Sequence, residues 1–531
     1  MQISPREHCP QICRISQPEV IVATAPPCDQ REMYARYKPL RNFLRGFNLW
    51  SGLGTVYSYM QYLQFGRELP ESLSTFATKW RMNNFKAQLY PHVVELLARE
   101  LILNGQRRGG KEFATAELSH KAMRMILDID GEAWGSHPAR SDDILLHLSR
   151  IGFQQFPWQR SLTTGLLARY HALYAHPAVA PIVEVRFEMS VNELFQLIML
   201  LIEETRRQPV LALEFLTAAE ASIVEPTKTL ISHLSSPIDE LQAQIAALQC
   251  YDVNWAHSFN PLRAYPLVHA GNPASVMCPA PPLLIQRLTD GLYFDLIRSD
   301  RAFGDAIGTA FEAYVGKVAA AIGGGAFTLL PEGRWGKPER RSVDWIMADD
   351  SAILFVECKL ARLDIASQTE ISEEPAFLVA LEKLAGSIGQ LYATLGDGLA
   401  GKYPHWQPDG RPIHPLVVTF YDWLVFGPYF YKHLDQRVGL EFERRGLDRS
   451  LLDRHPYSVC SISELEGLLT AARAHSIDVV LTSKNRPEAR QSLMHGFLVE
   501  HYPECISKLR GTFDDGMDAV TEGSSRFTGR R

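Results

Sequence analysis

The sequence lacks a hydrophobic run that is long enough to cross a membrane. The longest apolar run in its first half, Phe195–Ile202, is interrupted by Gln196 and falls far short of the about 20 apolar residues that a spanning helix needs. The eight cysteines are scattered without the spacing of a disulfide framework. Because no secretory signal stands at the start of the sequence, we expect a protein of the reducing cytoplasm with no membrane partner.

An excess of positive charge is also missing. The formal net charge is -6 at pH 7, so any contact with nucleic acid must come from local basic patches. The sequence contains no repeat of fixed period, and no zinc finger or RNA-recognition motif that would read bases. Hydrophobic residues at 46% and charged residues at 21% are the composition of an ordinary globular protein.

The length of the chain and the distribution of its prolines indicate several domains. The 531 residues are enough for roughly two to four domains. The prolines concentrated in residues 260–282 disfavour both a helix and a central strand there, and the polar end of the chain is typical of disorder. We therefore expect a mobile lead-in over 1–30, a helical region over 31–250, a Pro-rich connector over 251–290, a second folded domain over 291–505 and a disordered tail over 506–531.

The first half of the chain has the periodicity of helices. Apolar residues three and four positions apart recur in Asn83–Leu103, Val191–Arg206 and Pro237–Leu248, whereas strand signals are few. Such stripes form cores by default, so they predict an almost wholly helical region of unknown role. A protein partner is one use for it, and we expect it to pack on the second domain through residues 260–282.

The most informative stretch is a predicted hairpin. Two largely apolar runs, Val343–Ala348 and Ala352–Cys358, flank the polar break at residues 349–351, which is the pattern of two strands joined by a turn. Both runs are apolar on both faces, which favours strands inside a sheet that is covered on two sides.

Three charged residues converge at the open end of this hairpin. A loop of two or four residues sets Asp344 opposite Glu357, and the two-residue period of a strand puts Lys359 on the face of Glu357. Burying two carboxylates is costly without a partner, and Mg²⁺ or Mn²⁺ would provide one. The alternative is a surface hairpin with a chance aspartate and a salt-bridged Glu–Lys pair.

The spacing Asp344-x12-Glu357-x-Lys359 resembles the PD-(D/E)xK motif of the restriction-endonuclease-like nuclease superfamily. Val343 stands where the name of the motif has proline, a position that the superfamily varies. The resemblance implies a C-terminal α/β restriction-endonuclease-like domain, with a mixed central sheet flanked by helices, behind the helical N-terminal region. It also implies that Asp344 and Glu357 hold the metal, while Lys359 orients the attacking water or stabilises the developing charge.

The same resemblance implies two further site residues, both on predicted helices. Glu312, within Phe311-Glu312-x-Tyr314-Val315, resembles the glutamate that a helix ahead of the core sheet supplies to the metal site. Gln390 resembles a polar residue that a later helix turns toward the active site. On their own, such helical residues are usually solvated.

Arg334, Lys337, Arg340 and Arg341 form a loop that leads into Asp344. Four cations beside a metal site would suit a polyanionic backbone, and their alternative role is the solvation of a long loop.

The remaining elements of the second domain follow from the chain order. We expect strands at Ala326–Leu330, Leu416–Tyr421 and Ile477–Leu481, and a helix at Pro375–Leu395.

The function that these patterns favour is a Mg²⁺- or Mn²⁺-dependent endonuclease acting on DNA. Restriction or anti-phage defence is a role offered by analogy alone. Two alternatives stay open: an RNA-cleaving enzyme with the same site, and a catalytically silent nucleic-acid-binding or scaffold protein on the same fold.

Overall fold

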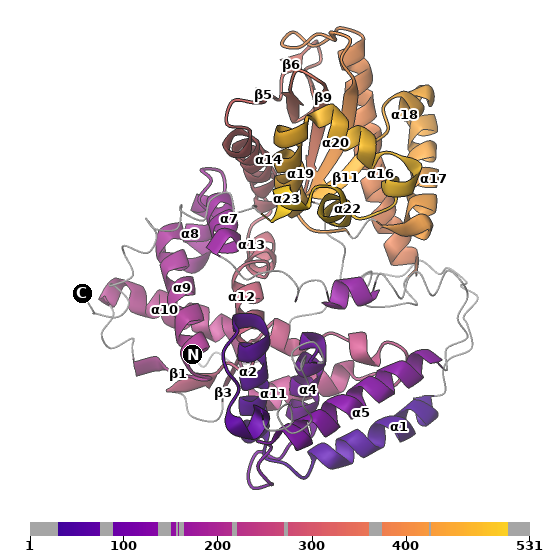
Figure 1. Ribbon diagram of the computed structural model, residues 1–531. Helices are drawn as coiled ribbons and strands as arrows, with labels where there is room; N and C mark the ends of the chain where they lie inside the picture. Colours follow the sequence, from indigo (N-terminus) through magenta and orange to yellow (C-terminus); the bar gives the residue numbers. More distant parts are fainter. Residues whose placement is uncertain are drawn as a thin grey trace, which may run out of the picture.

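The chain folds into mixed helix and sheet in two parts (Figure 1). The computed structural model describes residues 30–74, 89–135, 150–155, 158, 164–214, 220–269, 274–360, 374–423 and 426–507. Almost all of the expected lead-in (1–30) and tail (506–531) lies outside these residues. Among the described helices, none is both long and apolar enough to cross a membrane.

Helices dominate the N-terminal part, as predicted. A representative example is α9, whose first turn is closed by a capping box in which Ser190 and Glu193 satisfy each other's backbone N–H groups. The described helices of this part are α1 (Gln30–Leu44), α2 (Leu49–Phe65), α4 (Pro91–Asn104), α5 (Ala116–Gly135), α7 (Thr164–Tyr174), α8 (Ala180–Phe187), α9 (Val191–Arg207), α10 (Ala221–Leu234) and α11 (Ile238–Leu248).

A small sheet corrects the prediction of an almost wholly helical region. Its order is β1-β4-β3-β2, with β1 at Val210–Ala212, β2 at Ser235–Pro237, β3 at Leu267–His269 and β4 at Ser275–Met277. Each strand has only three residues, which is too short to show the alternation that identifies a strand in a sequence.

The Pro-rich segment 260–282 is also not what the sequence predicts. It contains β3 and β4, the two inner strands of the small sheet, because its prolines lie beside the strands rather than within them. Pro266 directly precedes β3, and Pro281 is the first residue of α12 (Pro281–Leu288), where a missing N–H costs nothing. Leu262, Val268 and Met277 pack into the core of the N-terminal part.

The C-terminal part is built on a five-stranded mixed sheet in the order β11-β10-β9-β8-β5. β8 pairs antiparallel with both β5 and β9, whereas β10 is parallel to β9 and β11. The strands are β5 (Thr328–Pro331), β8 (Trp345–Ala348), β9 (Ile353–Lys359), β10 (Ile413–Thr419) and β11 (Ser458–Ser461). The predicted hairpin and the predicted parallel strand after it are therefore confirmed.

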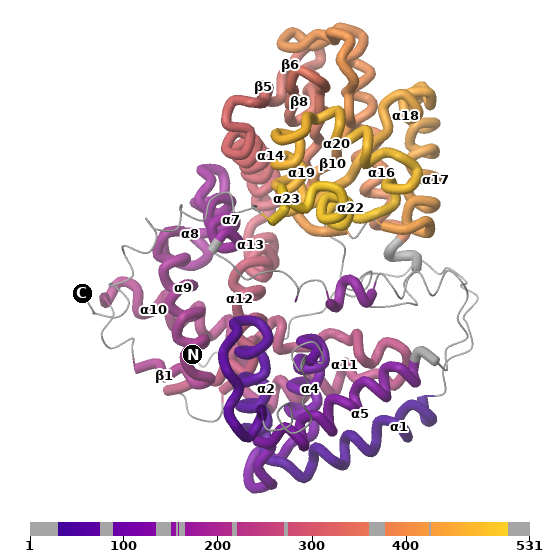
Figure 2. The backbone as a smooth tube through the Cα atoms, viewed as in Figure 1, coloured from indigo at the N-terminus to yellow at the C-terminus, as the bar shows by residue number. Residues whose placement is uncertain are grey.

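Helices cover both faces of this sheet (Figure 2). Leu354 and Val356 of β9 share a core with α14 (Phe303–Gly323) and α19 (Ile462–His475). Ile353 and Phe355 face the opposite way, toward α16 (Glu374–Leu399) and α17 (Gly427–Arg445). The double covering explains why both faces of the hairpin are apolar.

Shorter elements complete the fold. They are η3 (Trp255–His257), η4 (Pro261–Arg263), α13 (Leu292–Ser299), β6 (Arg334–Trp335), β7 (Arg340–Arg341), α18 (Ser450–Arg454), α20 (Ile477–Lys484), α21 (Pro487–Arg490), α22 (Met494–His501) and α23 (Pro503–Ile506).

The predicted strand at Ile477–Leu481 is wrong, because these residues form α20. Ser476 caps the helix by accepting a hydrogen bond from Val479 N. Ile477, Val480 and Leu481 are buried, which is the spacing of a helix face rather than the alternation of a strand. The strand at this edge of the sheet is β11, earlier in the chain.

The two parts meet where α7 packs against α14. Arg169 of α7 donates to Ser463 Oγ at 2.8 Å and pairs with Glu466 Oε1 at 2.8 Å, both on α19. The ring of Tyr170 packs edge-on against Phe420, with centroids 5.5 Å apart. The contacts between the parts therefore include α7, and Leu267, Val276 and Cys278 of the segment 260–282 belong to a core that is shared with the C-terminal sheet.

Candidate metal centre

Three carboxylates lie in one row across three strands at the end of the hairpin. Pro331 of β5 pairs with Trp345 of β8, which pairs in turn with Val356 of β9. One residue further along this register stand Glu332, Asp344 and Glu357. The row lies on the face that the sheet turns toward α16, since neighbouring side chains such as Ile346 and Phe355 belong to that core.

Asp344 is held by the backbone of the facing strand. Its Oδ2 accepts a hydrogen bond of 2.6 Å from Cys358 N. Burial raises the pKa of Asp344, although the Cys358 N–H and the Lys359 ammonium oppose the shift. The Asp344 carboxylate is therefore anchored to the strand that carries Glu357.

Glu357 is almost completely buried, with 1% of its surface exposed. Its Oε1 forms an ion pair of 2.7 Å with Lys359 Nζ, and no described protein group bonds to Oε2. Burial raises the pKa of Glu357 and the charge of Asp344 raises it further, against the opposing effect of Lys359. One ammonium does not compensate the desolvation of this carboxylate.

Lys359 closes β9 at the solvent edge of the site. Its side chain keeps 29% of its surface exposed, and its backbone oxygen accepts a hydrogen bond from Phe420 N. Burial would lower the pKa of Lys359, but Glu357 and Asp344 outweigh it and the pKa is raised. The ammonium is therefore charged at neutral pH and lies beside the carboxylate row.

Glu312 reaches the site from α14. Trp345 Nε1 donates a 2.8 Å hydrogen bond to the backbone oxygen of Glu312, which fixes the helix to the first residue of β8. Burial, Asp344 and Glu332 raise the pKa of Glu312 to about 7. The structure thus brings Glu312 into the electrostatic field of the row, as the sequence resemblance implied.

Glu332 is a site residue that the sequence reasoning missed. It pairs with Arg341 at 3.6 Å and with Arg334 at 3.8 Å, and its charge raises the pKa of both Glu312 and Asp344. The signal that could have found it is the register between β5 and β8, because that register sets Glu332 opposite Asp344.

The four predicted cations lie on β6, β7 and the turn between them, and all are exposed. Arg334 also pairs with Glu339 at 3.0 Å, and Arg340 pairs with Asp397 at 3.5 Å. No ion pair of Lys337 is present among the described residues. The hairpin stands next to the row, but nearby carboxylates already neutralise its arginines in part.

No hydrogen bond joins the Gln390 side chain to the carboxylate row among the described residues. It is exposed on α16, whose buried side chains, including Ile388 and Leu391, form the face that packs on the sheet. The resemblance predicted the residue type on the expected helix, but the helix turns this side chain to solvent.

The row suits a cation held by few protein ligands. Among the described residues, no three of its carboxylates bring one oxygen each within 4.8 Å of one another. Glu357 does offer oxygens without a hydrogen-bond partner among the described residues, and Mg²⁺ usually takes one or two carboxylates, several waters and substrate phosphate. Asp344 and Glu357 therefore fit Mg²⁺ or Mn²⁺ as a pair, with Glu312 and Glu332 near them.

Comparison with known proteins found no family model, no curated protein and no solved structure that this chain matches.

Proposed function

We propose that the chain is a Mg²⁺- or Mn²⁺-dependent endonuclease that hydrolyses phosphodiester bonds in DNA. The observation that carries this proposal is the placement of Asp344, Glu357 and Lys359 together at the end of the β8–β9 hairpin. A buried carboxylate pair with raised pKa values and a single ammonium is expensive to maintain for folding alone. Such an arrangement is typical of a site that is selected for chemistry.

Each residue has a distinct role in the proposed site. Asp344 and Glu357 hold the cation, and Glu312 is an accessory ligand. When bound, the cation neutralises phosphate charge and lowers the pKa of a coordinated water. Lys359 lies at the exposed end of β9, where its ammonium can orient the attacking water and stabilise the charge that develops on the phosphate.

The order of the elements supports the finer fold assignment. The chain runs from α14 through β5, β8 and β9 to α16 and then to β10. This sequence of one helix, three strands, one helix and one strand agrees with the layout that the resemblance to the restriction-endonuclease-like superfamily implies. The assignment to that fold is part of the proposal.

A polymeric phosphodiester suits the surroundings of the site. The exposed hairpin β6–β7 presents Lys337 and three arginines next to the carboxylate row, and phosphate oxygens can replace the carboxylates that now pair with the arginines. We propose DNA as the substrate and treat RNA as a competing outcome of the assay. A restriction or anti-phage role in the cytoplasm is the biological setting that we propose by analogy.

A cleavage panel tests the proposal. The full chain is incubated with supercoiled DNA, single-stranded DNA and RNA in Mg²⁺, Mn²⁺, Ca²⁺ or EDTA. We expect cleavage of DNA in Mg²⁺ or Mn²⁺ and none in EDTA, and we expect Asp344→Asn to abolish it. Lys383→Ala, which changes an exposed lysine on α16, is the control that retains activity.

Other outcomes of the panel replace the proposal. Cleavage of RNA alone, lost in Asp344→Asn, would assign the same site to an RNA-cleaving enzyme. Binding of nucleic acid without cleavage in any metal would instead favour a catalytically silent binding or scaffold protein.

A further inference from the structure

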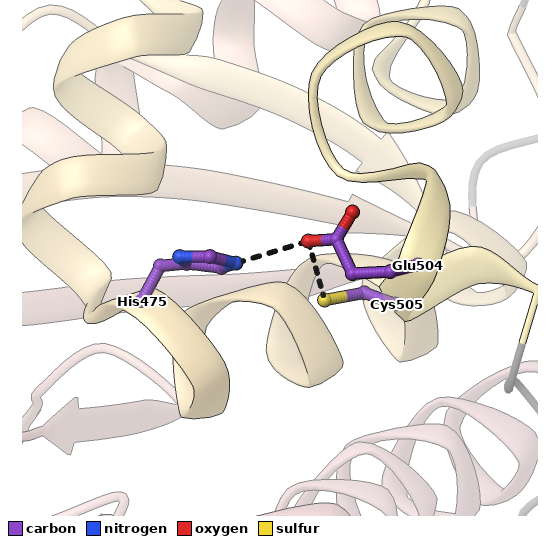
Figure 3. Close-up of side chains that lie close together, drawn as sticks. All are labelled: His475, Glu504 and Cys505. Carbon is purple, nitrogen blue, oxygen red and sulfur yellow. Dashed lines mark hydrogen bonds and ion pairs between the residues drawn. The ribbon is translucent and has the colours of Figure 1, made fainter.

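A second group of metal-ligand residues lies away from the carboxylate row, at the C-terminal end of the described chain (Figure 3). His475 is in the last turn of α19, and Glu504 and Cys505 are in α23. Figure 3 shows the imidazole and the sulfur directed at the same carboxylate. Among the described residues this is the one group of three such side chains whose ligand atoms lie within 4.8 Å of one another.

Two of the three ligand separations within the group are close to those of tetrahedral coordination, and the third, between His475 and Cys505, lies within 4.8 Å. His475 Nε2 is 3.2 Å from Glu504 Oε1, and Cys505 Sγ is 3.7 Å from the same oxygen. The bond lengths of tetrahedral zinc imply ligand separations of about 3.4 Å for N and O and about 3.6 Å for S and O. A cation can therefore enter this group with small movements of the side chains.

We propose that His475, Glu504 and Cys505 form a zinc site with three protein ligands and an open fourth position. One imidazole, one thiolate and one carboxylate are the donor types that zinc accepts, and the thiolate disfavours the harder Mg²⁺. Two of the side chains are exposed and the cysteine is buried. A cation can thus reach the group from solvent while the thiolate is protected on the protein side.

The position of the site gives it a structural consequence. Cys505 belongs to the large core that also contains residues of α14 and α19, and α23 packs against α19. Zinc bound here would hold α23 to the end of α19, because its ligands come from both helices. This proposal does not depend on the nuclease assignment, since the two groups share no residue.

Cobalt provides the direct test, because a cysteine thiolate bound to Co²⁺ gives a ligand-to-metal charge-transfer absorption that carboxylates and imidazoles do not give. The reduced full chain is titrated with Co²⁺ and then with Zn²⁺. We expect one equivalent of Co²⁺ to produce the band and to release protons from the ligands, and we expect Zn²⁺ to remove the band by displacing Co²⁺. Zinc should also raise the melting temperature by mass action.

Matched variants identify the ligands. The band should disappear in Cys505→Ser and in His475→Ala, and it should persist in Asp344→Asn, which alters only the carboxylate row. His495→Ala, which removes an exposed histidine on α22, should leave it unchanged. His475 is exposed, so its variant tests the site even where loss of the buried thiol impairs folding. Absence of the band in the unaltered chain, or its persistence in His475→Ala, overturns the proposal and leaves only hydrogen bonds between these groups.

Discussion

At the scale of single residues, the unusual feature is the concentration of negative charge around Glu357. Its carboxylate is buried, its Oε2 has no bond to a described protein group, and Asp344 and Glu312 both raise its pKa. Among the described residues, Lys359 is the one cation that forms an ion pair with it. A site of this kind binds protons when no metal is present, and it exchanges them for a divalent cation when one is added.

The pH dependence of the unfolding free energy measures how the negative charges of the row act on Glu312. Its folded pKa is raised from 4.5 to about 7, so the folded chain binds more protons than the unfolded chain between these values. Stability in EDTA should therefore fall as the pH rises through this window. Glu312→Gln removes that contribution, and its stability relative to the unaltered chain should improve from pH 5 to about pH 7 and level off above that.

Urea denaturation in EDTA across this pH range provides the measurement. Glu382→Gln, an exposed change on α16, should give a curve parallel to that of the unaltered chain. A Glu312→Gln curve that is also parallel would show that Glu312 is solvated and lies outside the field of the row.

The sequence predicted the pair Asp344 and Glu357 because one hairpin loop fixes the register between them. To predict Glu332, the register between β5 and β8 would also have to be known. The connection between these strands contains the β6–β7 hairpin, so their pairing cannot be recognised in the sequence. The case of Gln390 is different, since a motif indicates a residue type but not the direction in which a helix presents its side chain.

At the scale of elements, the packing of α14 on β8 positions the site. A β-carbon added at Gly316 would lie 2.1 Å from Trp345 Cζ2, so a glycine one turn after Glu312 lets the indole lie against the helix. The same indole donates to the Glu312 backbone. Glycine here permits the close approach that brings the helix to the carboxylate row.

Gly316→Ala tests this packing. Overpacking typically costs about 1–3 kcal/mol, and we expect a loss of unfolding free energy in that range together with reduced cleavage. Thermal and urea denaturation give the stability, and the cleavage assay gives the activity. Gly308→Ala is the matched control on α14, since an added β-carbon meets nothing within 4 Å and alanine should stabilise the helix by roughly 0.5–1 kcal/mol. Equal stability of the two variants would contradict the packing argument.

Long elements were predictable and short ones were not. The stripe of α14 and the apolar runs of β8 and β9 extend over enough residues for their period to be recognised. The three-residue strands β1 to β4 do not. At Ile477–Leu481 the β-branched residues favoured a strand, but the Ser476 cap and the tertiary burial pattern favoured the helix.

At the scale of the whole molecule, Arg169 joins the two parts. Its guanidinium pairs with Glu466 on α19 and lies in the field of Tyr314 on α14, two residues from Glu312. Both members of the ion pair are largely buried, with 13% and 8% of their side chains exposed. The N-terminal part therefore contacts the helix that carries Glu312.

Loss of the ion pair between Arg169 and Glu466 should lower both the unfolding free energy of the chain and its rate of DNA cleavage. Breaking a buried ion pair costs about 3–5 kcal/mol because one charge is left uncompensated, so we expect Arg169→Ala to reduce the unfolding free energy by up to that amount. Lys317→Ala, an exposed change on α14, is the control. Cleavage at full rate by a destabilised Arg169→Ala variant would show that α7 supports the fold without influencing the site.

The measurement that tests the account most directly is the single-turnover rate of DNA cleavage by Lys359→Ala in saturating Mg²⁺. The side chain is at the exposed end of β9, so its removal opens no core cavity and the fold should persist by circular dichroism. Loss of a positioned catalytic charge typically costs about 10²–10³-fold in rate, and Lys359→Arg should not restore it because a planar guanidinium cannot replace a compact ammonium. A folded Lys359→Ala protein that cleaves DNA at the unaltered rate would contradict the assignment of this site.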